Sequence, residues 1–176
     1  MATSPSPLSG SPGDPPTPGS TDHDPVALAR ALALAEASAA AGGGPFGAVV
    51  VRNGVVVAEG ANRVVLDHDP SAHAEVQALR AAGAALGTHD LAGCEVYSSC
   101  EPCPMCLAAL YWARVDRVWF AATREDAAAA GFDDARLYRE VALAPDDREL
   151  PVTGVDREAG RAPFAAWAAN AARTPY

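Results

Sequence analysis

One histidine and two cysteines in the sequence are spaced as ligands for a metal ion. His73 opens the segment His73-Ala74-Glu75, and Pro102-Cys103-Pro104-Met105-Cys106 follows at a distance of thirty residues. An imidazole together with two thiolates favours zinc among the common metals. Three protein ligands leave the fourth tetrahedral position open for water, which is typical of catalytic zinc sites. We therefore expect one Zn²⁺ per chain, bound by His73, Cys103 and Cys106.

Glu75 supplies the carboxylate that such a site needs for proton transfer. Zinc lowers the pKa of a water molecule that it binds toward about 7. A neighbouring carboxylate can take that proton and deliver it to a leaving amine. The H-x-E and P-C-x-x-C pair is the pattern of zinc deaminases. The pattern therefore predicts hydrolytic loss of ammonia, with Glu75 as the proton shuttle.

Two other interpretations of these residues remain open. Cys100 and Cys103 are also spaced C-x-x-C, so Cys100 could be a fourth ligand in a closed structural site. The chain could also be a non-catalytic zinc-binding interaction module, in which Glu75 has no catalytic part. Cys94 lies in an apolar segment and is expected to be a small buried side chain.

The local patterns predict an α/β fold whose helices position these residues. Asp69-Pro70 and Pro104 resemble helix starts, which would place the metal ligands near two helix N-termini, where the dipole favours thiolate. Asn53-Gly54 predicts a tight hairpin turn. Helices are expected at Val26–Ala40, from Asp69-Pro70 to Ala85, and at Pro104–Ala113, Thr123–Ala130 and Pro163–Ala172; strands are expected at Ala48–Val51, Val55–Glu59, Cys94–Ser98, Arg117–Ala121 and Pro151–Val155. The helical crossover between the third and fourth strands makes them parallel, so a mixed sheet with helices on its faces is expected.

Composition limits the domain number and the classes of partner. The chain has 176 residues, 49% hydrophobic and 20% charged, which suits one globular domain at residues 26–176. Residues 1–25 hold seven of the fifteen prolines and are expected to form a disordered tail. Thirteen arginines, no lysine and 22 acidic residues give a net charge of −9, which disfavours a nucleic-acid partner. Few cysteines, no membrane-length apolar run and no basic leader favour a cytoplasmic protein.

Beyond the metal motifs, the chain resembles the cytidine-deaminase-like superfamily and, within it, the bacterial guanine deaminases. The resemblance extends from about Leu28 to the last residue. The matching stretches are Gly43–Val49, Asp69–Val76, Ser99–Cys106, Leu110–Arg114 and Ala130–Asp134. The zinc motifs alone would indicate only the superfamily. Tyr111–Arg114, Gly131–Asp134 and an end at Tyr176 are similar to the guanine-specific members.

This resemblance implies a three-layer fold and a set of substrate contacts. It implies zinc on His73, Cys103 and Cys106, with Glu75 as proton shuttle and Asp134 assisting. Asn62, Ala74 and Asp134 would contact a small purine, while Phe46 and Trp112 would enclose it. It also implies a domain-swapped homodimer in which Tyr176 closes the neighbour's pocket.

Each substrate contact has an ordinary structural alternative. Asn62 could shape a turn, and Asp134 could cap a helix. Phe46 and Trp112 could be core residues. Guanosine, cytosine or ammeline could replace guanine as substrate with the same chemistry.

Overall fold

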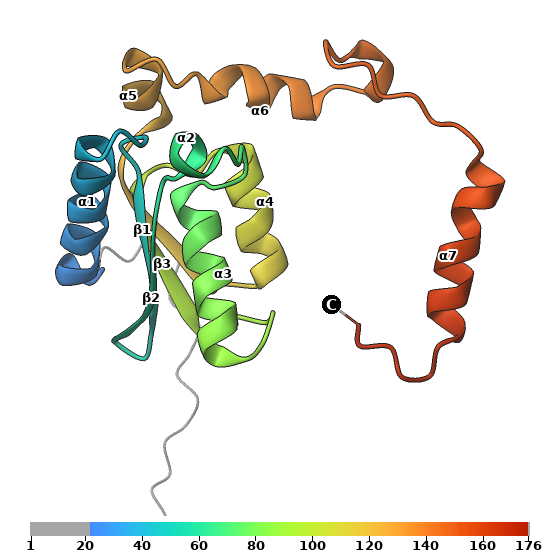
Figure 1. Ribbon diagram of the computed structural model, residues 1–176, viewed down its shortest axis with the longest axis horizontal. Helices are drawn as coiled ribbons and strands as arrows, with labels where there is room; N and C mark the ends of the chain where they lie inside the picture. Colours follow the sequence, from blue (N-terminus) through green and yellow to red (C-terminus); the bar gives the residue numbers. More distant parts are fainter. Residues whose placement is uncertain (1–21, 176) are drawn as a thin grey trace, which may run out of the picture.

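The computed structural model describes residues 22–175, and its centre is a four-stranded mixed sheet (Figure 1). The strand order is β2-β1-β3-β4, with β1 and β2 antiparallel, β1 and β3 antiparallel, and β3 and β4 parallel. The strands are β1 (Gly47–Arg52), β2 (Val55–Ala61), β3 (Cys94–Cys100) and β4 (Arg117–Ala122). Asn53 and Gly54 both have positive φ, as a primed hairpin turn requires. The expected hairpin and the parallel pair are confirmed.

Helices cover both faces of this sheet. Helix α1 (Pro25–Ala40) packs on β1 and β3, and α3 (Ala74–Leu86) packs on β2 and β1 from the other side. Helix α4 (Pro104–Ala113) lies beside α3 (Figure 1). The alternation along β1 explains the layers, because Val49 and Val51 join the α1 core while Ala48 and Val50 join the α3 and α4 core. The expected three-layer α/β fold is confirmed.

A glycine allows α3 to lie directly against the sheet. A Cβ atom on Gly60 of β2 would stand 2.2 Å from the carbonyl oxygen of Ala74 and 2.5 Å from the amide of Ala78. Any larger residue would push the helix away from the strand. This close packing fixes the N-terminus of α3, where His73 lies.

The start of α3 differs from the sequence prediction. The helix begins at Ala74 rather than at Asp69-Pro70. The Asp69 carboxylate accepts hydrogen bonds from the amide and hydroxyl of Ser71, and the Ala72 amide donates to the Asp69 carbonyl. Asp69 therefore forms a local turn instead of a helix cap. A short helix, α2 (Val64–Asp67), precedes this turn and was not predicted.

The C-terminal third contains more differences. After β4 come α5 (Arg124–Ala129), α6 (Asp134–Ala142), a 3₁₀ turn (Pro145–Asp147) and α7 (Arg157–Ala169). The prediction of a strand at Pro151–Val155 is wrong, since no neighbouring strand pairs with these residues, and α6 was not predicted. Helix α7 begins six residues before Pro163, because the Asp156 side chain caps it.

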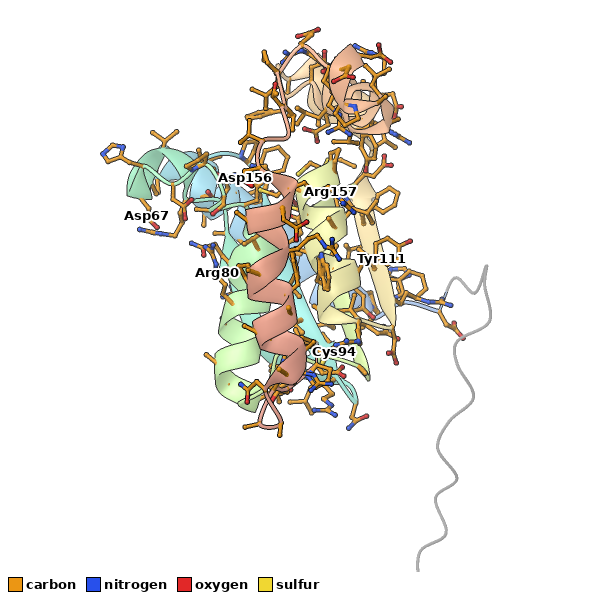
Figure 2. The ribbon with its side chains drawn as sticks, turned by 90° about the vertical axis from the view of Figure 1, so that its right-hand side faces the viewer. Asp67, Arg80, Cys94, Tyr111, Asp156 and Arg157 are labelled. Atoms are coloured by element: carbon orange, nitrogen blue, oxygen red, sulfur yellow. The ribbon has the colours of Figure 1, made fainter. Side chains whose placement is uncertain are left out.

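The last part of the chain extends away from the sheet. We call residues 143–175 the C-terminal arm; none of them is buried. Figure 1 shows α7 standing apart from the sheet and its helices, and in Figure 2 the same helix lies in front of α3 and α4, with Tyr111 and Arg157 labelled. Burial of apolar surface within the chain therefore does not hold the arm in place.

The N-terminal boundary lies close to the expected one. Residues 1–21 of the expected tail lie outside the described residues. Asp24 caps α1 by accepting hydrogen bonds from the amides of Val26 and Ala27. Within residues 22–175, no helix has both the length and the apolar character needed to cross a membrane.

Candidate metal centre and active site

His73, Cys103 and Cys106 meet at the N-termini of two helices. Their ligand atoms all lie within 4.8 Å of one another, and His73 Nδ1 is 3.5 Å from each of the two sulfur atoms. A tetrahedral zinc ion with ordinary Zn–N and Zn–S bonds would hold nitrogen and sulfur about 3.6 Å apart. The donor set and its spacing therefore fit zinc.

The local fold explains why these side chains converge. His73 is the N-cap residue of α3 and Cys103 is the N-cap residue of α4, and neither side chain caps its own helix. Both residues have an extended backbone conformation, so their side chains can point away from the helix and toward a shared metal ion. Pro104 occupies the first helical position, as predicted. The two positive helix ends favour the thiolate form that a metal needs.

Hydrogen bonding within the cluster favours one thiolate at a time. The pKa of Cys103 is lowered, because the Cys106 thiol donates a hydrogen bond to its sulfur, and the pKa of Cys106 is raised by the same contact. The pKa of His73 is raised, chiefly because its ring hydrogen-bonds to Cys103. A cation between the three groups would replace this sharing of protons.

Glu75 lies beside the ligands and is almost fully buried. Only 6% of the residue is exposed, and burial raises the pKa of its carboxyl above the usual value. The Ser98 hydroxyl donates a hydrogen bond of 3.3 Å to Glu75 Oε1. A buried carboxyl with a raised pKa is a stronger base than an exposed one, so it accepts a proton more readily. These properties suit the role of proton shuttle that the sequence suggests.

Cys100 faces away from the ligand cluster. Its thiol donates to the carbonyl oxygen of Thr123 at 3.5 Å, and burial raises its pKa to about 11. In the part of the chain that the structure describes, the cluster able to hold a metal contains one histidine and two cysteines without Cys100. The geometry thus favours the open three-ligand site over the closed structural site.

A cavity of about 330 Å³ opens onto this cluster. It brings together six residues singled out in the sequence, from five different segments. They are Phe46, Asn62, His73, Glu75, Cys103 and Asp134. The cavity also contains residues that the sequence analysis did not assign to the site: Gly42–Gly44, Val64, Val65 and Phe132.

Two phenylalanines form an apolar wall of the cavity. The rings of Phe46 and Phe132 meet edge to face, with centroids 4.9 Å apart. Such a pair presents the face of one ring and the edge of the other, so this side of the cavity is apolar. Phe132 belongs to the Gly131–Asp134 segment, so its closeness in sequence to Asp134 could have indicated that it lines the same cavity.

Asn62 is held by the backbone on one side of its carboxamide. Its Oδ1 accepts hydrogen bonds from the amides of Gly44 and Val64, both at 3.3 Å. The backbone amide of Asn62 donates to the backbone carbonyl of Phe46, and Ser38 Oγ donates to the backbone carbonyl of Asn62. Asn62 therefore shapes a turn and lines the cavity as well. With Oδ1 engaged, its amide nitrogen is the group left to donate to a ligand.

Asp134 lines the cavity from the first turn of α6. The expected helix-capping role belongs instead to Asp133, whose side chain accepts from the Ala135 amide. The pKa of Asp134 is raised, first by burial and then by the nearby negative charge of Cys103. This arrangement leaves the Asp134 carboxyl available to a ligand.

Three of the expected substrate contacts are not brought to the cavity within one chain. Ala74 is fully buried in the core beneath α3, so its side chain faces the sheet rather than the cavity. Trp112 is 66% exposed near the end of α4 and lies in a surface groove with Pro163, Phe164 and Trp167 of α7. Tyr176 lies outside the described residues.

Comparison with known proteins agrees with this geometry. Residues 21–122 match the family model of the cytidine and deoxycytidylate deaminase zinc-binding region. Guanine deaminase of Bacillus subtilis is 48% identical over 150 residues, which cover 85% of this chain and 96% of that protein. The tRNA-specific adenosine deaminase of the same species is 35% identical over 100 residues, covering 57% of this chain and 62% of its own length.

Solved structures give the same relationship. The X-ray structure of guanine deaminase from Bacillus subtilis matches with a TM-score of 0.83 and 47% identity, covering 86% of this chain and 97% of that one. Guanine deaminase from Nitrosomonas europaea matches with a TM-score of 0.59 and 42% identity, covering 61% and 63%. Together with the zinc-ligand geometry, these matches show that the chain belongs to the cytidine and deoxycytidylate deaminases with their zinc-binding region and, within them, to the guanine deaminase family.

Proposed function

We propose that this chain hydrolyses guanine to xanthine and ammonia. The observation that carries the proposal is the meeting of a zinc-ligand cluster, a buried carboxyl and two polar groups in one cavity of about 330 Å³. That volume is near the lower limit for small-molecule sites, which suits a free base better than a nucleoside. The names of the Bacillus and Nitrosomonas relatives support the same substrate. On this basis we assign residues 26–176 to one deaminase domain.

The protein residues divide the chemistry among them. When bound by His73, Cys103 and Cys106, zinc would supply Lewis-acid activation of water. Glu75 takes a proton from the attacking water and delivers it to the departing amino group, so that one water is consumed and one ammonia released. Ser98 holds the Glu75 carboxyl through the hydrogen bond at 3.3 Å.

The cavity wall is suited to recognising a purine base. Asn62 offers its amide nitrogen to a carbonyl oxygen or ring nitrogen of guanine. Asp134 pairs with the N–H groups of the base and assists proton transfer beside Glu75. Phe46 and Phe132 pack against the ring system, which excludes water from the reaction.

We further propose a homodimer in which the C-terminal arm closes the site of the neighbouring chain. The arm has no buried residue and exposes apolar side chains, including Phe164 at 76% and Trp167 at 45%. A second copy of the chain would give these side chains a surface to cover. The partner subunit's Tyr176 would then close the pocket, and Trp112 would pack against the exchanged helix.

The remaining partner and compartment assignments follow from charge and cysteine chemistry. A net charge of −9 suits a small neutral base better than a polyanionic nucleic acid. Cys103 and Cys106 bind zinc only while reduced, so we assign the protein to the cytoplasm.

Ammonia release from a panel of amines tests the substrate. Zinc-loaded protein is assayed with guanine, guanosine, cytosine, adenine and ammeline, and xanthine formation is followed by its absorbance. We expect turnover of guanine to exceed turnover of the others. Activity on another amine alone would retain the zinc chemistry and contradict the substrate assignment. Zinc binding with no turnover of any of the five would favour a non-catalytic zinc-binding module.

A further inference from the structure

Helix α6 carries Asp134 into the cavity although none of its residues is buried. It packs against α4 and α5 at the edge of the three-layer fold. A helix without buried side chains gains little from the hydrophobic effect. Its position, and with it the position of Asp134, must therefore depend on a small number of directed contacts.

One of these contacts joins α6 directly to the metal-binding loop. The Tyr138 hydroxyl donates a 2.8 Å hydrogen bond to the carbonyl oxygen of Pro102. Pro102 is buried and immediately precedes the zinc ligand Cys103. Tyr138 lies four residues after Asp134, so both side chains project from the same face of the helix. The bond therefore joins the helix that carries Asp134 to the segment that carries Cys103.

A second set of contacts holds the Tyr138 ring from the side of α5. The Arg124 guanidinium lies over this ring, 4.9 Å from its centroid. The same guanidinium is 3.2 Å from Glu101 Oε1, and the Arg124 amide donates to Glu101 Oε2 at 3.1 Å. Glu101 in turn donates its amide to the carbonyl of Ala122 at the end of β4. The tyrosine is thus clamped between the metal-binding loop and the start of α5.

We propose that Tyr138 is a positioning residue for deamination, acting through Asp134, and that Arg124 and Glu101 hold it in place. The inference rests on the proposed function, because it assigns a purpose to the placement of Asp134. Tyr138 itself does not line the cavity. Its effect on the reaction must therefore pass through the orientation of α6 over the metal site.

The first test compares Tyr138→Phe with Tyr97→Phe. The first variant removes only the hydroxyl that bonds to Pro102. The second removes a hydroxyl that donates to Glu95 and accepts from the Asp24 amide, on the α1 side of the sheet. We expect Tyr138→Phe to retain one zinc per chain and lose about tenfold in kcat/KM for guanine, since small misplacements of reacting groups cost this much or more. Tyr97→Phe should lower the melting temperature and leave kcat/KM unchanged.

A double-mutant cycle with Asp134→Asn separates positioning from general destabilisation. If Tyr138 acts through Asp134, Tyr138→Phe should change kcat/KM by less than about twofold once Asp134 is already Asn. If the tyrosine only stabilises the fold, the tenfold loss should persist in that background. The second result would overturn the proposal, as would an unchanged kcat/KM in the single variant.

Hydrogen exchange of the α6 amides supplies a readout that does not need turnover. Tyr138→Phe should speed exchange in residues 134–142 of the zinc-loaded protein, and Tyr97→Phe should not. Suppose that the wild type fails to deaminate guanine and that exchange is faster only in Tyr138→Phe. That result would reject the proposed function but would support the role of Tyr138 in holding α6. If the wild type deaminates guanine and Tyr138→Phe changes neither the exchange nor the kinetics, only the positioning role of Tyr138 would be rejected.

Discussion

Residues 25–122 and the C-terminal arm, residues 143–175, both contain regular helices but are held in place differently. In the first region the helices cover both faces of one sheet, and their inner residues, such as Ala31 and Ala78, are fully buried. In the arm, α7 is as long as α3, yet none of its residues is buried. The same local signal starts a helix in both regions, because Asp24 caps α1 and Asp156 caps α7. Only packing against a partner surface fixes where the helix lies.

The largest expected effect tests whether the chemistry resides in the first region. Glu75→Gln should retain zinc, because Glu75 is not a ligand, and should lose about 10²–10⁴-fold in kcat, because the amide cannot shuttle a proton. Stopped assays of ammonia release and metal analysis measure both. Glu59→Gln is a matched control, since Glu59 lies on β2 away from the cavity and forms an ion pair with Arg30 of α1. Wild-type turnover in Glu75→Gln would contradict the assigned role.

Removal of α7 tests the other side of the comparison. Truncation after Gly154 should leave a folded, zinc-binding chain, because the deleted residues contribute nothing to the core. We expect it to become monomeric and to lose about tenfold or more in kcat/KM, less than Glu75→Gln, because the chemical groups remain but water exclusion is lost. Sedimentation and kinetics check the two effects together. An unchanged mass with full activity would show that the arm neither joins two chains nor closes the site.

The sequence predicted the first region well because each of its signals is local and also agrees with the core. The hairpin turn requires positive φ, which Asn53 and Gly54 can adopt, and Pro104 starts α4 at a position where a proline is tolerated. The spacing of His73, Cys103 and Cys106 was enough to predict the metal site, because one imidazole and two thiolates favour few metals other than zinc. The start of α3 was misplaced because the Asp69 side chain bonds to Ser71 instead of capping a helix.

The arm and the cavity wall were harder to predict, for a physical reason. The β-branched residues Val152, Thr153 and Val155 favour extended structure, but a strand also needs a neighbour, and none pairs with them among the described residues. Trp112 was assigned to the pocket by resemblance, whereas within one chain it lies beside α7. The groove that holds Trp112 joins α4 to α7, two helices far apart in the sequence, and no local pattern encodes such a contact.

An intermediate effect is expected at a glycine of the cavity. A Cβ atom at Gly44 would stand 3.0 Å from both Cγ and Oδ1 of Asn62, so Gly44→Ala should displace the carboxamide. We expect KM for guanine to rise about tenfold with zinc retained, because a misaligned donor loses a substrate hydrogen bond. Steady-state kinetics measure the change.

The same substitution in the arm gives a matched control. A Cβ atom at Gly160 of α7 meets no atom within 4 Å, so Gly160→Ala should leave KM unchanged and favour the helix slightly. Equal effects at the two glycines would remove the distinction between the two regions. An unchanged KM in Gly44→Ala would show that Asn62 does not contact the substrate.

The smallest expected effect distinguishes an open from a closed metal site. Cys100 donates to the Thr123 carbonyl and lies outside the cluster of ligands. Cys100→Ser keeps a donor at that position, so we expect one zinc per chain, kcat/KM within about twofold of wild type and a loss of about 1 kcal/mol or less in stability. Cys103→Ser, measured beside it, should lose the metal. If Cys100→Ser also lost its zinc, the site would be a closed four-ligand site without the open position that hydrolysis requires.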